Sequence, residues 1–477
     1  MVKQSFTRQF QHHGKRVVNL LFDLFSKGVN RNGTVLFFLT GFAFFWFYSF
    51  LHRDTLFVHD AMNYWQARNS FVNNGHFSLL NYNSALRGYF FPFLLFVIQW
   101  QANLIGIDAQ LLFLTYSALL FAGLAFYLLP WFFEAAFTWD TPRPIKRPLF
   151  FILMFFFWRG HFLYPLTDFP ALSFFLLSLG ILVNIGAYKT KLLWAVLAGF
   201  AAGAAVNIRP IYQASCVVLL ILLPLFWNKL RRQEAFLGVV LFFLGMGVIL
   251  FPQLLVNRTH FQKSSPLVLS TYIEEENIYE IQLFWGLKTQ KYETNIGSDY
   301  PFASVVYRDP LADKIPQRLL RDKTIGGYLN IIRSYPVEVA VSYFRHFFNG
   351  LDIFFSTPYV KKIHANHFTF SSINYLVWFL VVYFSLTRTI ERYTSLGVVL
   401  SVLAPVLLSV PLVVEVRFFL PLHILAYGVV SYGLNYTEML QQIFVNKFRL
   451  VKFVCFLLVW MLMCFTLSAS TIEQLQS

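Results

Sequence analysis

Two aspartates lie at positions where a carboxylate could do acid–base chemistry. Asp60 opens a D-x-x-x-Y pattern that ends at Tyr64, a spacing typical of one helix face. Asp168 stands in a T-D-x-P turn between two apolar runs. A carboxylate within hydrogen-bond reach of a hydroxyl can accept its proton. Aspartate also caps helices and stabilises turns, so a structural role is the alternative for both.

Three arginines could supply fixed positive charge. Arg209 follows the apolar run 192–208, Arg417 precedes the run 418–434, and Arg87 precedes the run 89–105. The guanidinium group binds phosphate in a bidentate manner, which makes these residues candidates for a phosphate site. Arginine at a helix end also extends toward lipid headgroups, and Arg417 could simply pair with Glu415.

The composition restricts the protein to the membrane class. The 477 residues are 57% hydrophobic and only 13% charged, whereas globular domains carry about 25% charged residues. Since a water-soluble surface cannot be built from these residues, we expect a polytopic membrane protein embedded in lipid. The net charge of +15 comes largely from short basic loops between apolar runs, so we expect no nucleic-acid partner. The three cysteines lie within apolar runs and indicate neither disulfides nor a zinc site.

The apolar runs predict an all-α fold with about eleven transmembrane helices. Each is roughly 17 residues or longer, the length needed to cross a bilayer. The runs are 35–51, 110–135, 149–166, 169–187, 192–208, 211–227, 235–255, 372–387, 394–412, 418–434 and 453–469. Two further runs, 89–105 and 337–355, bring the apolar segments to thirteen.

Short loops rich in Lys and Arg predict the orientation of these helices. Such loops face the cytoplasm, and here they contain Lys3 to Arg31, Arg143 to Arg147, Lys189 and Lys191, Lys229 to Arg232, Arg388 and Arg392, and Lys447 to Lys452. Alternation places all of them on one side if 89–105 is interfacial or re-entrant and 337–355 is an external interfacial helix. Asp60, Asp168 and the three arginines then share the external face.

This orientation divides the chain into four parts. Residues 1–34 form a basic cytoplasmic N-terminus, and 35–255 form an N-terminal transmembrane catalytic module that includes an external loop at 52–109. Residues 256–371 form a second external loop that folds as a small domain, and 372–477 form the C-terminal transmembrane helices.

The motifs together resemble the GT-C superfamily of membrane glycosyltransferases, near family 39 and the lipid A aminoarabinose transferases. The similar features, in the same order along the chain, are Asp60 with Tyr64, Gly75, Arg87 and Pro92; Thr167, Asp168 and Pro170; a small-residue helix ending at Arg209 and Pro210; and an E-x-R-F-x-L-P motif from Glu415 to Pro421. The resemblance also implies a GT-C-like fold with two large external loops.

The resemblance implies transfer of a sugar from a polyprenyl-phosphate-linked donor to a hydroxyl of a glycolipid, polysaccharide or protein. The reaction would take place on the external side of the cell's inner (plasma) membrane. It would be a single inverting displacement with Asp60 as the base. The implied substrate-binding residues are Tyr64, Arg87, Asp168, Arg209, Glu415 and Arg417, and Asp60 and Asp168 together are candidate ligands for a divalent metal ion. The sugar and the acceptor stay open.

Two other functions fit a membrane protein with external arginines. A transporter or flippase for a lipid-linked sugar would bind phosphate without needing a base. The sequence shows no repeat of fixed period and few charged residues in the middle of its apolar runs, which disfavours that class. An O-antigen polymerase or ligase would use a lipid diphosphate donor, whereas the motifs here resemble enzymes that use a lipid monophosphate.

Overall fold

The computed structural model describes residues 31–137, 146–227, 231–272, 276–316, 318–320, 323–387, 393–444 and 447–476. Most of the basic N-terminus predicted for 1–34 lies outside the described residues, as do Arg143, Lys229, Arg388 and Arg392.

The chain is mostly helical, with 73% helix and 5% strand, as expected for a helical membrane protein. Within the described residues, seven helical stretches are long and apolar enough to cross a membrane: Gly33–Leu51, Ala109–Ala136, Lys191–Ile208, Arg232–Phe261, Phe368–Thr387, Val416–Gly433 and Lys447–Ile472. Four shorter apolar helices cover Phe90–Ile105, Asp168–Val183, Tyr212–Phe226 and Thr394–Ser409. The figure of eleven spans therefore stays a prediction. Several expected spans form helices shorter than the roughly 20 residues that a perpendicular crossing needs.

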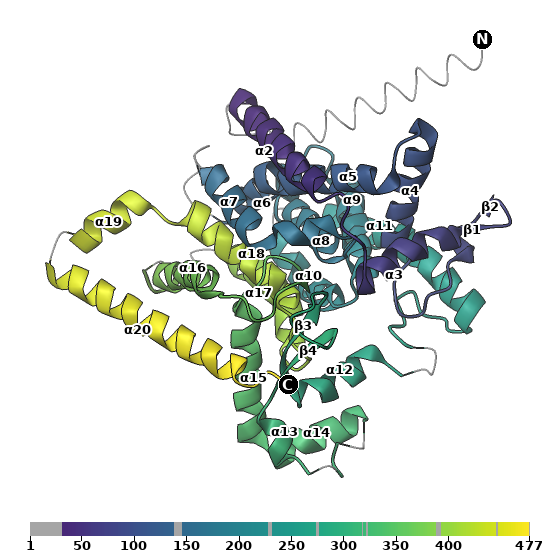
Figure 1. The fold of residues 1–477 in the computed structure, drawn as a ribbon. Helices are drawn as coiled ribbons and strands as arrows, with labels where there is room; N and C mark the ends of the chain where they lie inside the picture. Colours follow the sequence, from purple (N-terminus) through teal and green to yellow (C-terminus); the bar gives the residue numbers. More distant parts are fainter. Residues whose placement is uncertain are drawn as a thin grey trace.

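The helices in the parts predicted to be transmembrane are α2 (Arg31–Leu51), α5 (Ala109–Gly123), α6 (Leu129–Ala136), α7 (Lys146–Trp158), α8 (Asp168–Val183), α9 (Lys191–Ile208), α10 (Tyr212–Phe226), α11 (Arg232–Phe261), α16 (Phe368–Thr387), α17 (Tyr393–Ser409), α18 (Leu420–Gly428) and α20 (Lys447–Ile472). The short turn η6 (Val416–Phe419) leads into α18, and α19 (Tyr436–Phe444) precedes α20. Figure 1 shows α5, α8, α9 and α11 gathered in one body, with α19 and α20 at its side.

Polar contacts join the first turns of several helices. Lys191 at the start of α9 pairs with Glu234 at the start of α11, with 3.2 Å between Nζ and Oε2. Arg147 at the start of α7 donates to the Thr34 hydroxyl near the start of α2, at 2.9 Å. Arg209 follows the opposite end of α9. On α9, therefore, the basic start and the candidate residue Arg209 lie at opposite ends of the same helix.

The two ends of the first loop, which joins α2 to α5, lie next to each other. The Gln110 side chain at the start of α5 donates to the Arg53 carbonyl at the end of α2, at 2.8 Å. The loop contains α3 (His59–Ala67), the hairpin β1 (Val72–Asn73) and β2 (His76–Phe77), and α4 (Phe90–Ile105). Asn74 and Gly75 form the hairpin turn with φ of 49° and 79°, the left-handed conformations that this turn requires.

The second loop carries a small three-stranded sheet that the all-α prediction did not include. Its strands lie in the order β4 (Ser304–Arg308), β3 (Thr289–Asn295), β5 (Tyr359–Val360). The strand segments are rich in Thr, Tyr and Val, which favour the extended conformation. The helices of this loop are α12 (Ile278–Gly286), α13 (Leu311–Lys314), α14 (Ile325–Ser334) and α15 (Pro336–Leu351), and Figure 1 shows them around β3 and β4 at the bottom of the view.

The C-terminal tail extends this sheet. The Arg308 N–H donates to the Gln474 carbonyl at 2.9 Å, and the Gln476 N–H donates to the Val306 carbonyl at 3.0 Å. These bonds lie on the edge of β4 that β3 leaves open. The end of α20 is therefore fastened to the second loop.

Helix α15 corresponds to most of 337–355, the segment predicted to lie in the membrane interface. Its outer face exposes Val337, Val341 and Phe344. Its inner face is tied to protein, because the Arg345 guanidinium pairs with buried Asp309. The helix is therefore amphipathic, and its orientation relative to a bilayer stays a prediction.

Candidate active site

Six of the seven candidate site residues line one cavity of about 470 Å³. They come from four separate parts of the chain: α3, the segment before α4, the end of α9, and the segment that enters η6. The six are Asp60, Tyr64, Arg87, Arg209, Glu415 and Arg417. The seventh, Asp168, contacts this group through Arg209.

Asp60 accepts a hydrogen bond from one arginine on each carboxylate oxygen. Arg87 Nη2 lies 2.7 Å from Oδ1, and Arg417 Nη2 lies 3.2 Å from Oδ2. Burial raises the pKa of Asp60, but the Arg417 and Arg87 charges outweigh it and hold the pKa below its usual value. The N-cap position of α3 is Val58. Asp60 is thus an ionised cavity residue and does not occupy the cap position that formed the structural alternative.

The backbone around Asp60 is held in an unusual conformation. His59 has a φ of 47°, in the left-handed region that few side chains occupy. The Ala61 N–H donates to the Tyr359 hydroxyl of β5 at 3.0 Å, which fastens the first turn of α3 to the second loop. Residues on both sides of Asp60 therefore fix where its carboxylate lies.

Arg417 joins two carboxylates and an aromatic ring. Its Nε donates to Glu415 at 2.5 Å, so the pairing considered from the sequence is present. The Phe418 ring lies near both Arg417 and Arg209, whose guanidinium carbons are 5.8 Å and 5.1 Å from its centroid. An aromatic ring attracts cations, so Phe418 favours the approach of both arginines to the cavity. The sequence motif included Phe418, but its role was not predicted.

Arg87 is positioned by two tyrosines. Its guanidinium carbon lies 4.9 Å from the centroid of the Tyr64 ring. The Tyr82 hydroxyl donates to the Arg87 carbonyl at 3.0 Å. Tyr64 therefore contacts the arginine that holds Asp60, and it lines the cavity at the same time.

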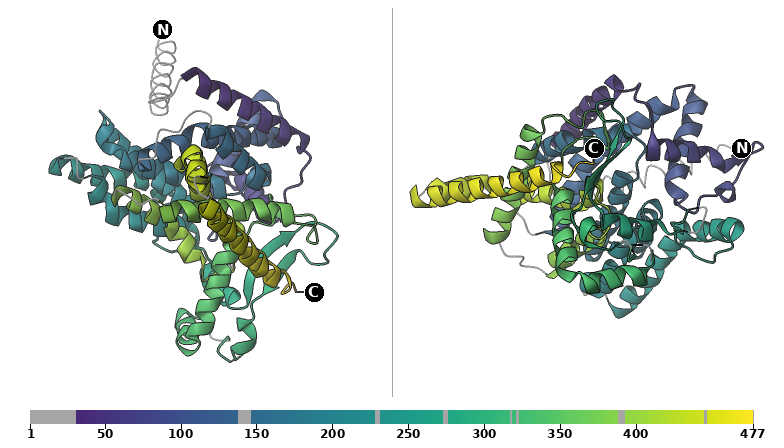
Figure 2. Two further views of the ribbon diagram at one scale, coloured as in Figure 1. Left: turned by 90° about the vertical axis from the view of Figure 1, so that its left-hand side faces the viewer. Right: turned by 60° about the horizontal axis from the view of Figure 1, so that its bottom comes forward.

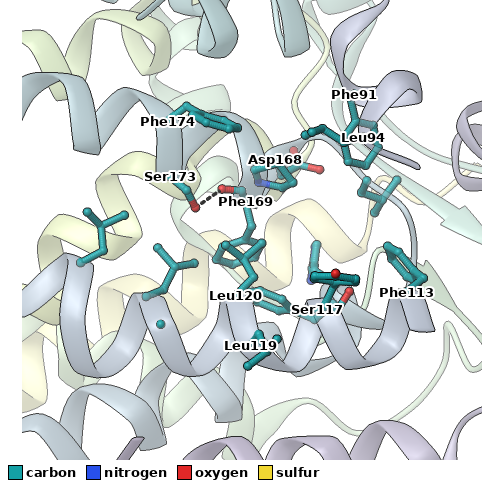
Figure 3. Close-up of a pocket in the computed structure, with 18 of the residues that line it drawn as sticks. Phe91, Leu94, Phe113, Ser117, Leu119, Leu120, Asp168, Phe169, Ser173 and Phe174 are labelled. Atoms are coloured by element: carbon teal, nitrogen blue, oxygen red, sulfur yellow. Dashed lines mark hydrogen bonds between the residues drawn. The ribbon is translucent and has the colours of Figure 1, made fainter. Parts of the chain in front are cut away.

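Asp168 is buried, with 1% of its side chain exposed, and forms an ion pair with Arg209. It begins α8 and lines a second cavity, of about 770 Å³, whose other residues are nearly all apolar. Figure 3 shows Asp168 among apolar side chains of this second cavity, including Phe91, Leu94 and Phe174. The Asp168–Arg209 pair thus links the apolar cavity to the polar one.

The two carboxylates considered as metal ligands are each paired with arginine. Asp60 is paired with Arg87 and Arg417, and Asp168 is paired with Arg209. In the described part of the chain, no three His, Cys, Asp or Glu side chains are grouped so that they could hold a metal ion. A divalent cation shared by the two carboxylates would therefore have to compete with these arginines.

A ladder of buried amides, which the sequence analysis missed, positions two of the arginines. The Asn207 amide donates to Gln253 at 2.9 Å, and Gln253 donates to Asn257 at 2.9 Å. The Asn207 oxygen also accepts the Phe90 N–H at the start of α4, at 2.9 Å. The ladder therefore joins α4, which follows Arg87, to the end of α9. Gln253 and Asn257, four residues apart within an apolar helix, are the feature of the sequence that could have indicated this ladder.

Gly88 allows this junction to form. A Cβ atom at this position would lie 1.9 Å from the Asn207 carbonyl oxygen, far inside any permitted contact. The start of α4 therefore packs directly on the backbone at the end of α9, and only glycine permits that approach.

Strand β3 places a second pair of charges behind the cavity. Tyr292 and Thr294 line the cavity, whereas Lys291 and Glu293 belong to the opposite face of the strand. Lys291 is fully buried, and its Nζ donates to the Asp352 carbonyl at 2.7 Å. Burial raises the pKa of Glu293 to about 7, because it outweighs the lowering by Lys291 and Arg417, and Glu415 and Asp352 add to the rise. The sequence analysis did not select either residue.

Comparison with known proteins does not assign a family. A scan against models of known protein families found no match to the chain, and a search of curated proteins found no match.

Proposed function

We propose that the protein is a glycosyltransferase that moves a sugar from a polyprenyl-phosphate donor to an acceptor hydroxyl. The observation that carries this proposal is the ionised Asp60 carboxylate, held by two arginines in a polar cavity that adjoins an apolar one. A base, a phosphate-binding charge and a channel for a lipid chain are the three parts that such a reaction needs.

Asp60 is the accessible carboxylate of the group. Forty per cent of its side chain is exposed, compared with 18% for Glu415 and 1% for Asp168. A carboxylate has about four lone-pair positions, and the two arginine contacts use only two of them. An acceptor hydroxyl entering the cavity can therefore donate to Asp60.

The arginines keep unused donors for a phosphate. Each guanidinium has five N–H groups. Arg417 uses Nε and Nη2 for the carboxylates, and Arg87 uses Nη2. Both arginines line the cavity in which charge would accumulate as the phosphate leaves, where fixed donors act most strongly.

The proposed reaction is a single displacement. The acceptor oxygen attacks the anomeric carbon while its proton passes to Asp60. The bond between the anomeric carbon and the phosphate oxygen breaks, and the electron pair leaves with the polyprenyl phosphate, which the arginines hold. The configuration at the anomeric carbon inverts. We assign the apolar cavity to the first isoprene units, with the Asp168–Arg209 pair orienting the phosphate end.

The proposal includes a membrane orientation. We infer about eleven spans in the inner (plasma) membrane, with the polar cavity on the external side. Lys191 at the start of α9 and Arg209 after its end lie at opposite ends of that helix, which supports this orientation.

Substitution of Asp60 by Asn tests the base. Asn is similar in size but cannot accept the hydroxyl proton, so transfer should fall by roughly two to four orders of magnitude while donor binding persists. The substrate pair is first identified by mass spectrometry of lipopolysaccharide, wall polymers and proteins from cells with and without the chain. Release of labelled sugar from its polyprenyl phosphate is then measured with purified protein.

Asp54→Asn is the matched control. Asp54 lies in the same loop, but its side chain is 95% exposed and contacts only Arg53 among the described residues. Its variant should keep full activity. An active Asp60→Asn protein, or an equal loss at Asp54, contradicts the assignment. A donor that crosses the membrane with its sugar still attached indicates a transporter.

A further inference from the structure

Helix α20 leaves most of its surface without protein contact. It spans 26 residues from Lys447 to Ile472, and only Cys464, Ser468 and Thr471 are buried within it. Figure 1 shows α19 and α20 as two arms of a V, and Figure 2 shows α20 projecting from the body. In a bilayer, lipid must cover the rest of this helix.

A pocket of about 380 Å³ lies at the Lys447 end of α20, between α16, α19 and α20. Helix α20 contributes four residues to it, Arg449, Lys452, Phe453 and Phe456. These occupy positions i, i+3, i+4 and i+7, so they share one helix face. Along that face the two cations come first and the two aromatic rings follow.

Aromatic rings from α20 and α16 pack against each other at the end of the pocket away from Arg449. The centroid of Phe379 on α16 lies 5.3 Å from that of Phe453 and 5.2 Å from that of Phe456. Tyr383, one turn nearer the cationic end, lies 5.7 Å from Phe453 and also lines the pocket. The pocket therefore has a polar end and an apolar end.

We propose that this pocket binds the phosphate of an anionic glycerophospholipid from the surrounding bilayer, with the acyl chains running along α20. The order of cations followed by aromatic rings matches the order of phosphate followed by acyl chain in a lipid. No Asp or Glu is found among the described residues that line this pocket. Glu438, on α19, accepts from the Gln442 amide instead. Basic pockets between transmembrane helices bind anionic headgroups in this way.

A titration with two lipids tests the proposal. Purified full-length protein in detergent is titrated with dioleoyl phosphatidylglycerol or with dioleoyl phosphatidylcholine. The melting temperature and the lipid retained in native mass spectrometry are measured. Phosphatidylglycerol should raise the melting temperature and remain bound at one molecule per chain, and phosphatidylcholine should do neither.

Two double variants separate this pocket from general surface charge. Arg449→Gln with Lys452→Gln should raise the phosphatidylglycerol concentration at half effect at least tenfold. Lys189→Gln with Arg231→Gln removes the same number of exposed cations from other helix ends and should leave the titration unchanged. All four side chains are exposed, so folding should not depend on them.

Three outcomes overturn the proposal: an equal effect of both lipids, an equal loss in both double variants, or a lipid-independent dimer that the Arg449 and Lys452 substitutions abolish. The last outcome would make a second copy of the chain the occupant.

Discussion

At the scale of single residues, the cavity contains opposite charges in close balance. Asp60, Glu415 and Asp168 are set against Arg87, Arg209 and Arg417. Arg417 is central to this balance because it contacts both Asp60 and Glu415. Removing it leaves two neighbouring carboxylates to repel each other, in addition to removing a phosphate ligand.

Replacement of Arg417 by Ala should therefore impair donor use more than replacement by Lys. Arg417→Ala should lower kcat/KM for the donor by two to three orders of magnitude, about 3–4 kcal/mol in the barrier. Arg417→Lys should recover only part of the lost kcat/KM. An ammonium group lacks the fixed fork of N–H donors that lets a guanidinium contact both carboxylates and a phosphate. Donor kinetics measure both. Arg53→Ala, at an exposed site in the first loop, is the control, and unchanged kinetics at Arg417 would exclude a role in donor recognition.

Glu293 should make stability depend on pH near neutrality. Its folded-state pKa is raised to about 7, so the protonated form is favoured by folding. Its stabilising contribution is fully present below the unfolded value near 4.5 and is lost as pH rises toward 7. The groups around it are Lys291 on β3, Tyr307 on β4, Asp352 after α15, and Glu415 and Arg417 before α18.

Glu293→Gln fixes a neutral side chain and should remove that dependence. At pH 8 the variant should be more stable than the parent by about 3 kcal/mol, and the difference should shrink to less than about 1 kcal/mol near pH 5. Melting temperatures in detergent from pH 5 to 8 measure it. Parallel curves for parent and variant would show that Glu293 titrates normally.

At the scale of secondary-structure elements, the junction of α4 with α9 decides where the arginines lie. Gly88 packs on the Asn207 carbonyl, and the amide ladder extends from there along α11. Arg87 precedes Gly88 by one residue, and Arg209 follows Asn207 by two residues. A shift of α4 therefore moves one arginine relative to the other.

Gly88→Ala should consequently lower both stability and activity. Overpacking at a rigid contact costs about 1–3 kcal/mol, and the displaced Arg87 should weaken donor binding. Gly247→Ala on α11 is the matched control, because an added Cβ there meets nothing within 4 Å. Melting temperature and donor KM measure the effect. A Gly88→Ala protein as stable and active as the control would show that the junction is adaptable.

The sequence allowed the helical membrane class and the cavity residues to be predicted, for identifiable reasons. Apolar length identifies helices, and charged residues at helix ends are few enough to select. Asp60 and Arg417 could be predicted in this way. Glu293 was not, because its environment comes from Asp352 and Glu415, which are distant in sequence. The β3–β4 sheet was missed because short strands have weak periodicity beside long apolar helices.

At the scale of the whole molecule, the proposed orientation places the polar cavity outside and the basic helix starts inside. A cysteine at Asp299 should react with a membrane-impermeant thiol reagent in intact cells, and a cysteine at Arg231 should not. Both positions are exposed in the structure. Cys455, the exposed native cysteine, is first replaced by Ser. Labelling of the Arg231→Cys variant without labelling of the Asp299→Cys variant would invert the topology.

The attachment of the tail to β4 has a consequence for biosynthesis. The edge of β4 is paired by residues 474–476, which leave the ribosome more than 160 residues after β4 itself. The second loop must therefore wait, with an open strand edge, until α20 has entered the membrane. Insertion of the last helix thus completes the same sheet whose other edge holds α3 through Tyr359. A chain that stalls before α20 would display an open strand edge, which is a template for pairing with another chain and for aggregation.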